Sequence, residues 1–438
     1  MSDPTDVVTA FLRHEGDLLL VRRSDAVGTY SGRWGGVSGY AEGDPDGQVR
    51  REIREETGID PDRLTLVRSG RPLAVDDEET GRAWRVHPYL FDAPTRDVDP
   101  NEELAAVEWA PAPAMLDRET VPALWETYER VAPDPRSIAA DDEHGAAALS
   151  VRALAVLRDR AALARREDVT IGELRDLAAR LRRARPSMAV LRNRVTRAVA
   201  DADAPADVEQ AAIDGIERAV VADREAAGAA AALVGDAVLT LSRSGTVRET
   251  LRRASPERVY VAESRPAGEG VAVAEALADD PDVDAAVTLL SDAAVAHVLA
   301  TEDIDAVLVG ADTVLPDGRV VNKTGTRAAA LSAAHESVPV YAVAAADKVT
   351  HEPTVSLESG AAGAVYDGDA DVDALNPTFD VTPADAVTVV TEDGPLDADA
   401  VAAVAERHRD LTPGEDAGDD VSRGRRGNDE PSGGDGRN

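Results

Sequence analysis

Residues 34–59 read WGGVSGYAEGDPDGQVRREIREETGI, and three glutamates near the end of this stretch dominate its chemistry. Glu52, Glu55 and Glu56 are spaced i, i+3 and i+4, so on an α-helix they share an arc of roughly 100°. Like charges so placed repel unless a cation lies between them. Mg²⁺ is a natural partner because it prefers oxygen ligands and bridges to substrate phosphates. The alternative is a solvated helix face with an Arg51–Glu55 ion pair.

The surrounding residues predict a mixed α/β unit over residues 5–131. Alternating apolar runs on either side of residues 14–16 predict a β-hairpin. The stretch 44–58 is expected to form a helix that ends at Gly58. Further strands are expected at 64–70, 85–91 and 105–111, and a closing amphipathic helix at 119–131.

The complete pattern resembles the Nudix box, in which a glycine, five residues, a glutamate and seven residues precede R-E-U-x-E-E-x-G-U, with U aliphatic. Gly36 and Glu42 have the expected spacing, and residues 51–59 match the second part. One extra residue precedes Arg51, in a predicted loop at 43–49, and should lengthen that loop without disturbing the helix face. The resemblance implies a Nudix hydrolase domain with an α/β/α sandwich over residues 1–135.

The resemblance also implies roles for residues of the predicted helix. Glu52, Glu55 and Glu56 would bind Mg²⁺ or Mn²⁺. Arg51 would orient these glutamates by ion pairing. The metal would polarise a diphosphate and lower the pKa of an attacking water. A further ligand is expected from a later loop, where Glu102 and Glu103 both qualify. Substrates of this family are nucleoside diphosphates linked to another moiety, which the sequence does not identify.

The composition is that of an acidic chain without cysteine. Forty-seven basic against 83 acidic residues give a net charge of −36, and 3% of residues are aromatic. Such a charge repels nucleic acid and anionic membranes, and it resembles an adaptation to high salt. The absence of cysteine excludes disulfides, thiolate ligands and cysteine nucleophiles. No apolar run has the length of a membrane span and no signal-peptide core is present, which predicts a cytoplasmic protein.

The remainder of the chain shows two patterns. Apolar residues at spacings of three and four predict a helical subdomain over residues 145–235. Short β-rich runs then alternate with Ala-rich helical stretches, which is typical of a parallel, doubly wound sheet and predicts a Rossmann-like subdomain over residues 236–411. A Pro- and Asp-rich linker is expected at 136–144 and a disordered acidic tail at 412–438.

Only two of the 47 basic residues are lysines, Lys323 in VVNKTGTRAA (320–329) and Lys348. A strongly hydrated ammonium that faces a phosphate is not readily replaced by a planar guanidinium, so we expect both lysines at a site. Doubly wound folds bind ligands beyond the carboxyl ends of their strands, and a helix start there can hold a phosphate. Residues suited to such a site follow these predicted strands at Ser244, Gly245, Arg265 and Asp312. Each alone is an ordinary strand-to-helix turn, but together they predict a pocket for a phosphorylated ligand.

The order of motifs in residues 141–395 resembles a family that joins the alpha, beta and delta subunits of translation initiation factor 2B with two sugar-phosphate isomerases. Those isomerases act on ribose-1,5-bisphosphate and methylthioribose-1-phosphate. The motifs are ARPSM, ESRPAGEG, LLSDAAVAHVL, VGADTVLPDGRVVNKTGT and NPTFDVTP. The resemblance implies catalysis by Asp312 and a homo-oligomer formed through residues 236–395. It implies substrate phosphate and hydroxyl contacts at Gly145, Ala146, Arg185, Asn322, Lys323 and Lys348.

Two positions depart from this family. The isomerases pair the aspartate with a cysteine that falls at Ser242 here, and they carry an arginine where this chain has His144. A thiol with a pKa of about 8.5 exchanges a proton near neutrality, whereas a serine hydroxyl needs an adjacent base. The family's isomerase mechanism therefore cannot operate unchanged, and binding of a sugar or nucleotide phosphate is favoured over isomerisation.

Three functions remain open from the sequence. In the first, the Nudix domain hydrolyses a diphosphate-linked nucleotide or sugar, and the second domain binds a phosphorylated ligand. In the second, that domain also isomerises an aldose 1-phosphate such as ribose-1,5-bisphosphate, with Asp312 and with Ser242 or another group. In the third, the initiation-factor-like domain assembles into a regulatory complex and the Nudix domain is a ligand sensor.

Overall fold

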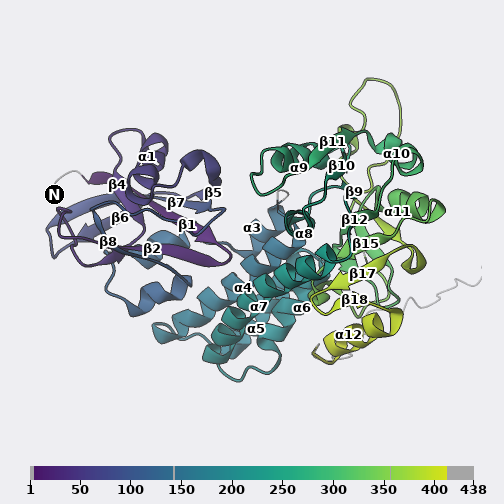
Figure 1. The fold of residues 1–438 in the computed structure, drawn as a ribbon. Helices are drawn as coiled ribbons and strands as arrows, with labels where there is room; N and C mark the ends of the chain where they lie inside the picture. The colour runs from purple at the N-terminus through teal and green to yellow at the C-terminus, as the bar shows by residue number, and fades with distance from the viewer. Residues whose placement is uncertain (1–3, 142–143, 356, 412–438) are drawn as a thin grey trace, which may run out of the picture.

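A computed structural model describes residues 4–141, 144–355 and 357–411 and confirms a mixed α/β protein (Figure 1). Its first part, purple in Figure 1, is built on a mixed eight-stranded sheet. Five strands follow the order β3-β2-β1-β7-β5. In addition, β4 pairs with β1, β6 pairs with β7 and β8 pairs with β2. The strands are β1 (Thr5–His14), β2 (Asp17–Arg23), β3 (Trp34–Gly35), β4 (Val37–Tyr40), β5 (Thr65–Ser69), β6 (Leu73–Asp77), β7 (Arg82–Asp92) and β8 (Leu104–Ala110). The predicted hairpin joins β1 to β2.

Helix α1 (Pro45–Thr57) covers one face of this sheet. It begins after Asp44, whose side chain accepts a hydrogen bond from the Gly47 N–H, and it ends at Gly58 with φ of 70°, as predicted. Its buried Val49 and Ile53 belong to the same apolar cluster as residues of β1. Because the helix starts at Pro45, residues 45–49 of the loop expected at 43–49 belong instead to the first turns of α1.

The central part is helical and lies between the two sheets in Figure 1. It consists of α2 (Leu124–Glu129), α3 (Pro135–Ala140), α4 (Ala146–Ala162), α5 (Ile171–Ala184), α6 (Ala189–Ala200) and α7 (Pro205–Ala231). The predicted linker contains α3, whose Ile138 is 1% exposed. One apolar cluster joins Phe11 and Leu90 of the first sheet to Leu149 and Leu157 of α4. The first sheet and the helices therefore share a core.

Polar contacts hold the β1–β2 hairpin against these helices. Arg158 of α4 is 2% exposed, and its Nη1 donates a hydrogen bond to the carbonyl of Gly16 at 2.9 Å. The charge of this buried guanidinium is balanced by Asp159 at 2.8 Å, which also accepts a hydrogen bond from the Tyr128 hydroxyl at 2.9 Å. A buried charge is tolerated when it is paired in this way.

The last part contains a seven-stranded sheet with the order β11-β10-β9-β12-β15-β17-β18. All neighbours are parallel except β17 and β18, which confirms the predicted parallel sheet. Its strands are β9 (Ala237–Leu241), β10 (Arg258–Ala262), β11 (Ala286–Leu290), β12 (Ala306–Gly310), β15 (Val340–Val343), β17 (Thr388–Thr391) and β18 (Gly394–Leu396). The strand order reverses between β9 and β12, which is where such sheets bind ligands.

Five helices and a small sheet accompany these strands among the described residues. The helices are α8 (Gly245–Ala254), α9 (Glu269–Ala278), α10 (Val295–Thr301), α11 (Thr326–His335) and α12 (Ala398–Leu411). The small antiparallel sheet consists of β13 (Thr313–Val314), β14 (Val320–Lys323) and β16 (Phe379–Thr382). Within the described ranges, no helix is both long and apolar enough to cross a bilayer. The acidic tail expected at 412–438 lies outside the described residues.

Candidate functional sites

Glu56 is a deeply buried carboxylate of α1, with 2% of its surface exposed. Its Oε1 accepts a hydrogen bond from the Ser38 N–H at 3.4 Å, whereas its Oε2 has no hydrogen-bond partner in the described part of the chain. Burial raises the pKa of Glu56 to about 8, and the charge of Glu52 acts in the same direction. A cation beside this carboxylate would stabilise its charge.

Glu52 lies one helical turn before Glu56 and faces the same region. Burial raises the pKa of Glu52, and the charges of Glu55 and Glu103 raise it further. The charge of Glu103 also raises the pKa of Glu56. Glu103 therefore lies within electrostatic reach of both α1 carboxylates, which favours Glu103 over Glu102 as the additional acidic residue of this site.

Two contributors to this site carry no signal in the sequence pattern. Gln48 donates a hydrogen bond from Nε2 to Glu52 Oε1 at 2.6 Å. Gly39 of β4 lies so close to the Glu52 carboxylate that any Cβ at position 39 would collide with it. The Arg51–Glu55 ion pair left open by the sequence is absent among the described residues, and both side chains are exposed. Within the described part of the chain, Arg51 therefore forms no ion pair with these glutamates, although its charge opposes the rise in the pKa of Glu52.

The donor set at α1 suits a hard divalent cation. Within residues 4–141, 144–355 and 357–411, no group of three or more histidine, aspartate or glutamate side chains is placed so that it could hold a metal ion. The Glu56 Oε2 has no hydrogen-bond partner in the described part of the chain, and burial, together with the charges of neighbouring glutamates, raises the pKa values of Glu52 and Glu56. Carboxylate oxygens are also the ligands that Mg²⁺ prefers. The residue types at α1 therefore match the cation that the sequence predicts, whereas the described side chains do not form a group of three that could hold it.

The second predicted site lies at the carboxyl edge of the parallel sheet. Ser242 follows β9, Glu269 begins α9 after β10, and Asp312 follows β12. The Ser242 hydroxyl donates a hydrogen bond to Glu269 Oε2 at 2.9 Å, and Glu269 Oε1 forms an ion pair with Lys323 Nζ at 3.2 Å. Lys323 also lies over the Phe379 ring, 5.5 Å from its centroid. Glu269 was not predicted, because nothing in its local sequence marks it as a partner of Ser242.

Both lysines lie near Asp312. Burial raises the pKa of the Asp312 carboxyl, and the charges of Lys348 and Lys323 oppose that rise. Lys348 is 6% exposed, and its ammonium group donates a hydrogen bond to the carbonyl of Ala311, next to the aspartate. The structure thus brings together the two lysines and the aspartate that the sequence singled out.

The other predicted residues of this edge have local partners. Asn322 is 6% exposed and donates a hydrogen bond to the Thr326 hydroxyl at 2.9 Å. Ser244 caps α8 by accepting from the Val247 N–H, and no other atom lies within 4 Å of a Cβ built on Gly245. The space beside Gly245 at the start of α8 is therefore unfilled by the described residues. In contrast, the Arg265 guanidinium forms an ion pair with Glu263 at 3.0 Å.

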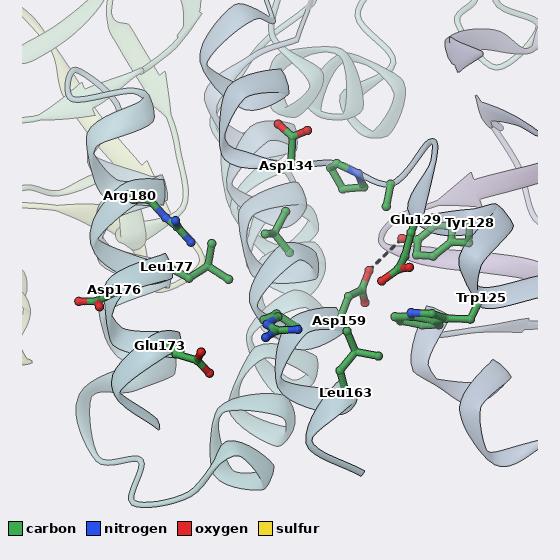
Figure 2. Close-up of a pocket in the computed structure, with 14 residues that line it drawn as sticks. Trp125, Tyr128, Glu129, Asp134, Asp159, Leu163, Glu173, Asp176, Leu177 and Arg180 are labelled. Atoms are coloured by element: carbon green, nitrogen blue, oxygen red, sulfur yellow. Dashed lines mark hydrogen bonds between the residues drawn. The ribbon is translucent and has the colours of Figure 1, made fainter. Parts of the chain in front are cut away.

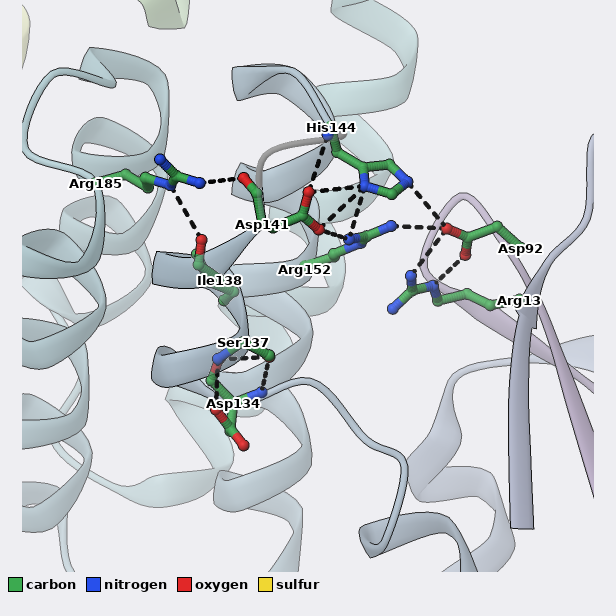
Figure 3. A network of polar contacts seen from close by, with 9 residues as sticks. All are labelled: Arg13, Asp92, Asp134, Ser137, Ile138, Asp141, His144, Arg152 and Arg185. Carbon is green, nitrogen blue, oxygen red and sulfur yellow. Dashed lines mark hydrogen bonds and ion pairs between the residues drawn. The ribbon is translucent and has the colours of Figure 1, made fainter. Parts of the chain in front are cut away.

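Predicted contacts near the start of α4 lie in a network that reaches the first sheet (Figure 3). Arg185 donates hydrogen bonds to the carbonyls of Ile138 and Asp141. His144 Nδ1 lies 2.9 Å from Asp141, and His144 Nε2 lies 3.7 Å from Asp92 at the end of β7. Gly145 and Ala146 directly follow this histidine, as the N-cap and first residue of α4.

Arg152 of α4 and Arg13 of β1 complete this network. Arg152 pairs with Asp92 at 2.7 Å and with Asp141, and Arg13 pairs with Asp92 at 2.8 Å. On the opposite side, the Thr313 hydroxyl donates to the carbonyl of Ser187 at 3.0 Å, which links the segment after Arg185 to the residue after Asp312. The segment that follows Arg185 is thus in contact with the segment that follows Asp312. Sequence spacing does not reveal Asp92 or Arg152.

A cavity of about 510 Å³ lies away from both predicted sites, between α2, α4 and α5 (Figure 2). None of the residues predicted for catalysis or binding lines it. Its walls include Trp125, Tyr128, Asp159, Leu163, Glu173 and Arg180.

Asp347, which precedes Lys348, anchors the second site to α6. It pairs with Arg194 at 2.9 Å and with Arg197 at 2.7 Å. Burial alone would raise the pKa of Asp347, but the two arginines outweigh burial and hold that pKa below its ordinary value. The pairing therefore stabilises the fold above the unfolded-state pKa of about 3.9, and this contribution is lost as the pH falls below it.

We expect Asp347→Asn to lower the free energy of unfolding by about 3 kcal/mol at neutral pH, because it leaves the buried Arg194 without its anion. The variant should also lose less stability than the wild type between pH 5 and pH 3. Denaturant unfolding across this range measures both effects, with exposed Asp385→Asn as the control. Equal pH dependence of Asp347→Asn and wild type would contradict the assignment.

Comparison with protein families matches residues 3–131 to the NUDIX domain and residues 142–398 to the initiation factor 2 subunit family. Among curated proteins, the methylthioribose-1-phosphate isomerase of Pseudomonas aeruginosa (strain UCBPP-PA14) is 36% identical over 183 residues, which are 38% of this chain and 49% of that protein. The enzyme of the same name from Azotobacter vinelandii is 34% identical over 177 residues, 37% of this chain and 48% of that protein. The chain spans about half the length of these relatives.

Two solved structures from Pyrococcus horikoshii OT3 are also similar. The translation initiation factor eIF-2B has a TM-score of 0.51 and 25% identity, covering 60% of this chain and 94% of that one. The 5-methylthioribose 1-phosphate isomerase has a TM-score of 0.50 and 21% identity, covering 64% of this chain and 87% of that one, and this likeness concerns the fold alone.

Proposed function

This chain belongs to the initiation factor 2 subunit family and carries a NUDIX domain at residues 3–131, and on that premise we propose a Mg²⁺-dependent hydrolase joined to a phosphate-binding domain. The hydrolase would cleave a nucleoside- or sugar-diphosphate-linked substrate. The second domain would bind a sugar or nucleotide phosphate. The observation that carries the hydrolase assignment is the buried Glu56 carboxylate, with one unpartnered oxygen, beside the further acidic groups of α1.

The residues proposed to hold the cation are Glu52, Glu55, Glu56 and Glu103. When bound, Mg²⁺ or Mn²⁺ would polarise the diphosphate and lower the pKa of the attacking water. The protein's own part is to keep the carboxylates in place: Gln48 holds Glu52 by a hydrogen bond, and the Ser38 N–H holds Glu56. Gly39 leaves space for the Glu52 side chain.

A substrate screen on the whole chain tests this proposal. Nucleoside diphosphates linked to sugars or to a second nucleoside are incubated with the protein in molar potassium chloride and Mg²⁺, and phosphate, AMP and sugar phosphates are followed together. We expect one substrate class to be cleaved, with the activity lost in EDTA and restored by Mg²⁺. A panel left intact at every metal concentration would contradict the hydrolase assignment.

The proposed ligand of the second domain carries a phosphate near Lys323, Lys348 and the open start of α8. Lys323→Ala is expected to weaken binding of ribose-1,5-bisphosphate by about tenfold, because it removes a charge-assisted contact. Isothermal titration calorimetry measures the dissociation constant. Arg319→Ala, which removes an exposed cation from the neighbouring turn, serves as the control and should bind as the wild type does. An unchanged dissociation constant in Lys323→Ala would remove Lys323 from the pocket.

A second candidate function is isomerisation of an aldose 1-phosphate by the same domain. Its support is the 36% identity with methylthioribose-1-phosphate isomerases, together with the proximity of Asp312 to both lysines. The natural substrate of this chain would then be a pentose 1-phosphate, and conversion of ribose-1,5-bisphosphate or 5-methylthioribose 1-phosphate to the ketose is the assay.

A further inference from the structure

Ser242 is held in an uncommon backbone conformation at the carboxyl edge of the sheet. Its φ is 61°, in the left-handed region that residues with a Cβ rarely adopt. The Ser242 N–H donates a hydrogen bond to the Ser264 hydroxyl at 2.7 Å, and Ser264 itself has a φ of 59°. Such conformations persist only where the surrounding structure determines them, and they cluster at functional sites. Ser242 is 8% exposed, so its hydroxyl direction is set by the protein.

The Ser242 hydroxyl points to a carboxylate rather than to solvent. It donates to Glu269 Oε2 at 2.9 Å, while the other oxygen of Glu269 pairs with Lys323 at 3.2 Å. A glutamate in the first turn of a helix is favourable by itself, and that could explain a glutamate at the start of α9. The helix dipole does not explain why both carboxylate oxygens contact residues of the predicted ligand site. Glu269 also lies close enough to Asp312 to raise the pKa of that carboxyl, after burial.

This arrangement supplies the adjacent base that a serine needs when it stands where the related isomerases have a cysteine. A serine hydroxyl gives up its proton only to an adjacent base, and a carboxylate at hydrogen-bond distance is such a base. We propose that Glu269 is a further catalytic residue, which accepts a proton through the Ser242 hydroxyl during isomerisation of an aldose 1-phosphate. The inference rests on the second candidate function, and it identifies how that function could operate without cysteine.

The step balances as a redox-neutral isomerisation. The bond between C1 and the ring oxygen breaks, and the hydrogen on C2 moves to C1 with its electron pair, so C2 is oxidised and C1 is reduced. The ring oxygen takes up a proton from Asp312. The C2 hydroxyl gives its proton to Ser242 Oγ while the Ser242 proton passes to Glu269 Oε2, which leaves a ketone at C2. No other reactant is needed.

The same transfer changes the pairing of Lys323. While Glu269 is ionised, it holds Lys323 at 3.2 Å. Once Glu269 is protonated, the ion pair is lost and the ammonium charge is available to the substrate phosphate. Removing the Glu269 charge by mutation should therefore slow turnover without weakening substrate binding, which separates a catalytic role from a structural one.

The test uses the whole chain with 5-methylthioribose 1-phosphate and ribose-1,5-bisphosphate as probes. For a probe that the wild type converts, Glu269→Gln is expected to lower kcat by about a hundredfold, with a KM no higher than that of the wild type. Glu275→Gln, on an exposed position of the same helix, is the matched control and should keep full activity. Circular dichroism and thermal unfolding verify that each variant is folded.

A double variant supplies the decisive comparison. Ser242→Cys combined with Glu269→Gln is expected to recover at least tenfold in kcat over Glu269→Gln alone, because a thiol loses its proton without a neighbouring base. One outcome would overturn the role of Glu269 and leave the isomerase function in place: an active wild type, an inactive Asp312→Asn, and a Glu269→Gln variant with wild-type kcat. If the wild type converts neither probe in molar salt, the isomerase function fails and the proposed role fails with it.

Discussion

Glu56→Gln is expected to lower kcat for Mg²⁺-dependent diphosphate hydrolysis by about a thousandfold, or ~4 kcal/mol of transition-state stabilisation. The substitution keeps the size of the side chain and removes its charge. Glu56 has a buried oxygen without a hydrogen-bond partner among the described residues and lies beside Glu52. Of the α1 carboxylates, Glu56 therefore has the charge that a bound cation would stabilise most. A glutamine amide cannot replace that anionic ligand, and the apparent Mg²⁺ requirement should rise as well.

The measurement is the rate of product release across Mg²⁺ concentrations in molar potassium chloride. Glu78→Gln, an exposed position in the turn between β6 and β7, is the control for the loss of a negative charge from the same domain and should retain wild-type activity. An unfolding midpoint close to that of the wild type verifies that Glu56→Gln is folded. Hydrolysis at the wild-type rate in Glu56→Gln would exclude α1 as the catalytic helix.

Asp312→Asn is expected to reduce conversion of ribose-1,5-bisphosphate to ribulose-1,5-bisphosphate by about a thousandfold, because an amide can neither donate nor accept the proton. Asp312 is the acidic group that the structure places beside both Lys323 and Lys348. Burial already raises the pKa of the Asp312 carboxyl, so the neutral asparagine should be accommodated without loss of the fold.

The control for this variant is Asp317→Asn, an exposed carboxylate paired with Arg319 in the nearby turn. Hydrolysis by the first domain should be unchanged in Asp312→Asn, and isomerisation should be unchanged in Glu56→Gln. That double dissociation would assign the two activities to two separate sites of one chain. If isomerisation persists in Asp312→Asn, another group must serve as the acid.

The two domains are nevertheless joined by packing and charge. The first sheet shares its core with α4, and Asp92 at the end of β7 is bound by Arg13 and Arg152. Arg152 also pairs with Asp141, whose backbone carbonyl accepts from Arg185. The start of α4 is thus positioned by residues of both the NUDIX domain and the second domain, as Figure 3 shows.

The local sequence determined those features whose causes lie within a few residues. The α1 helix follows from its apolar spacing and from Gly58, and the common face of Glu52, Glu55 and Glu56 follows from helical geometry alone. The parallel sheet follows from the alternation of β-rich and helical runs. Lys323 and Lys348 could be singled out because they are the only two lysines of the chain, and a residue count requires no information about tertiary contacts.

Only the tertiary structure decided which side chains meet across the fold. Ser242 and Glu269 are 27 residues apart and come together because β9 and β10 are adjacent parallel strands that end at one edge. Gly39 is needed because β4 passes against the Glu52 carboxylate, and Asp92 reaches His144 because the first sheet packs on α4. Local spacing encodes helical and strand faces through the backbone repeat, whereas these contacts depend on how separate elements pack, which no short stretch of sequence contains.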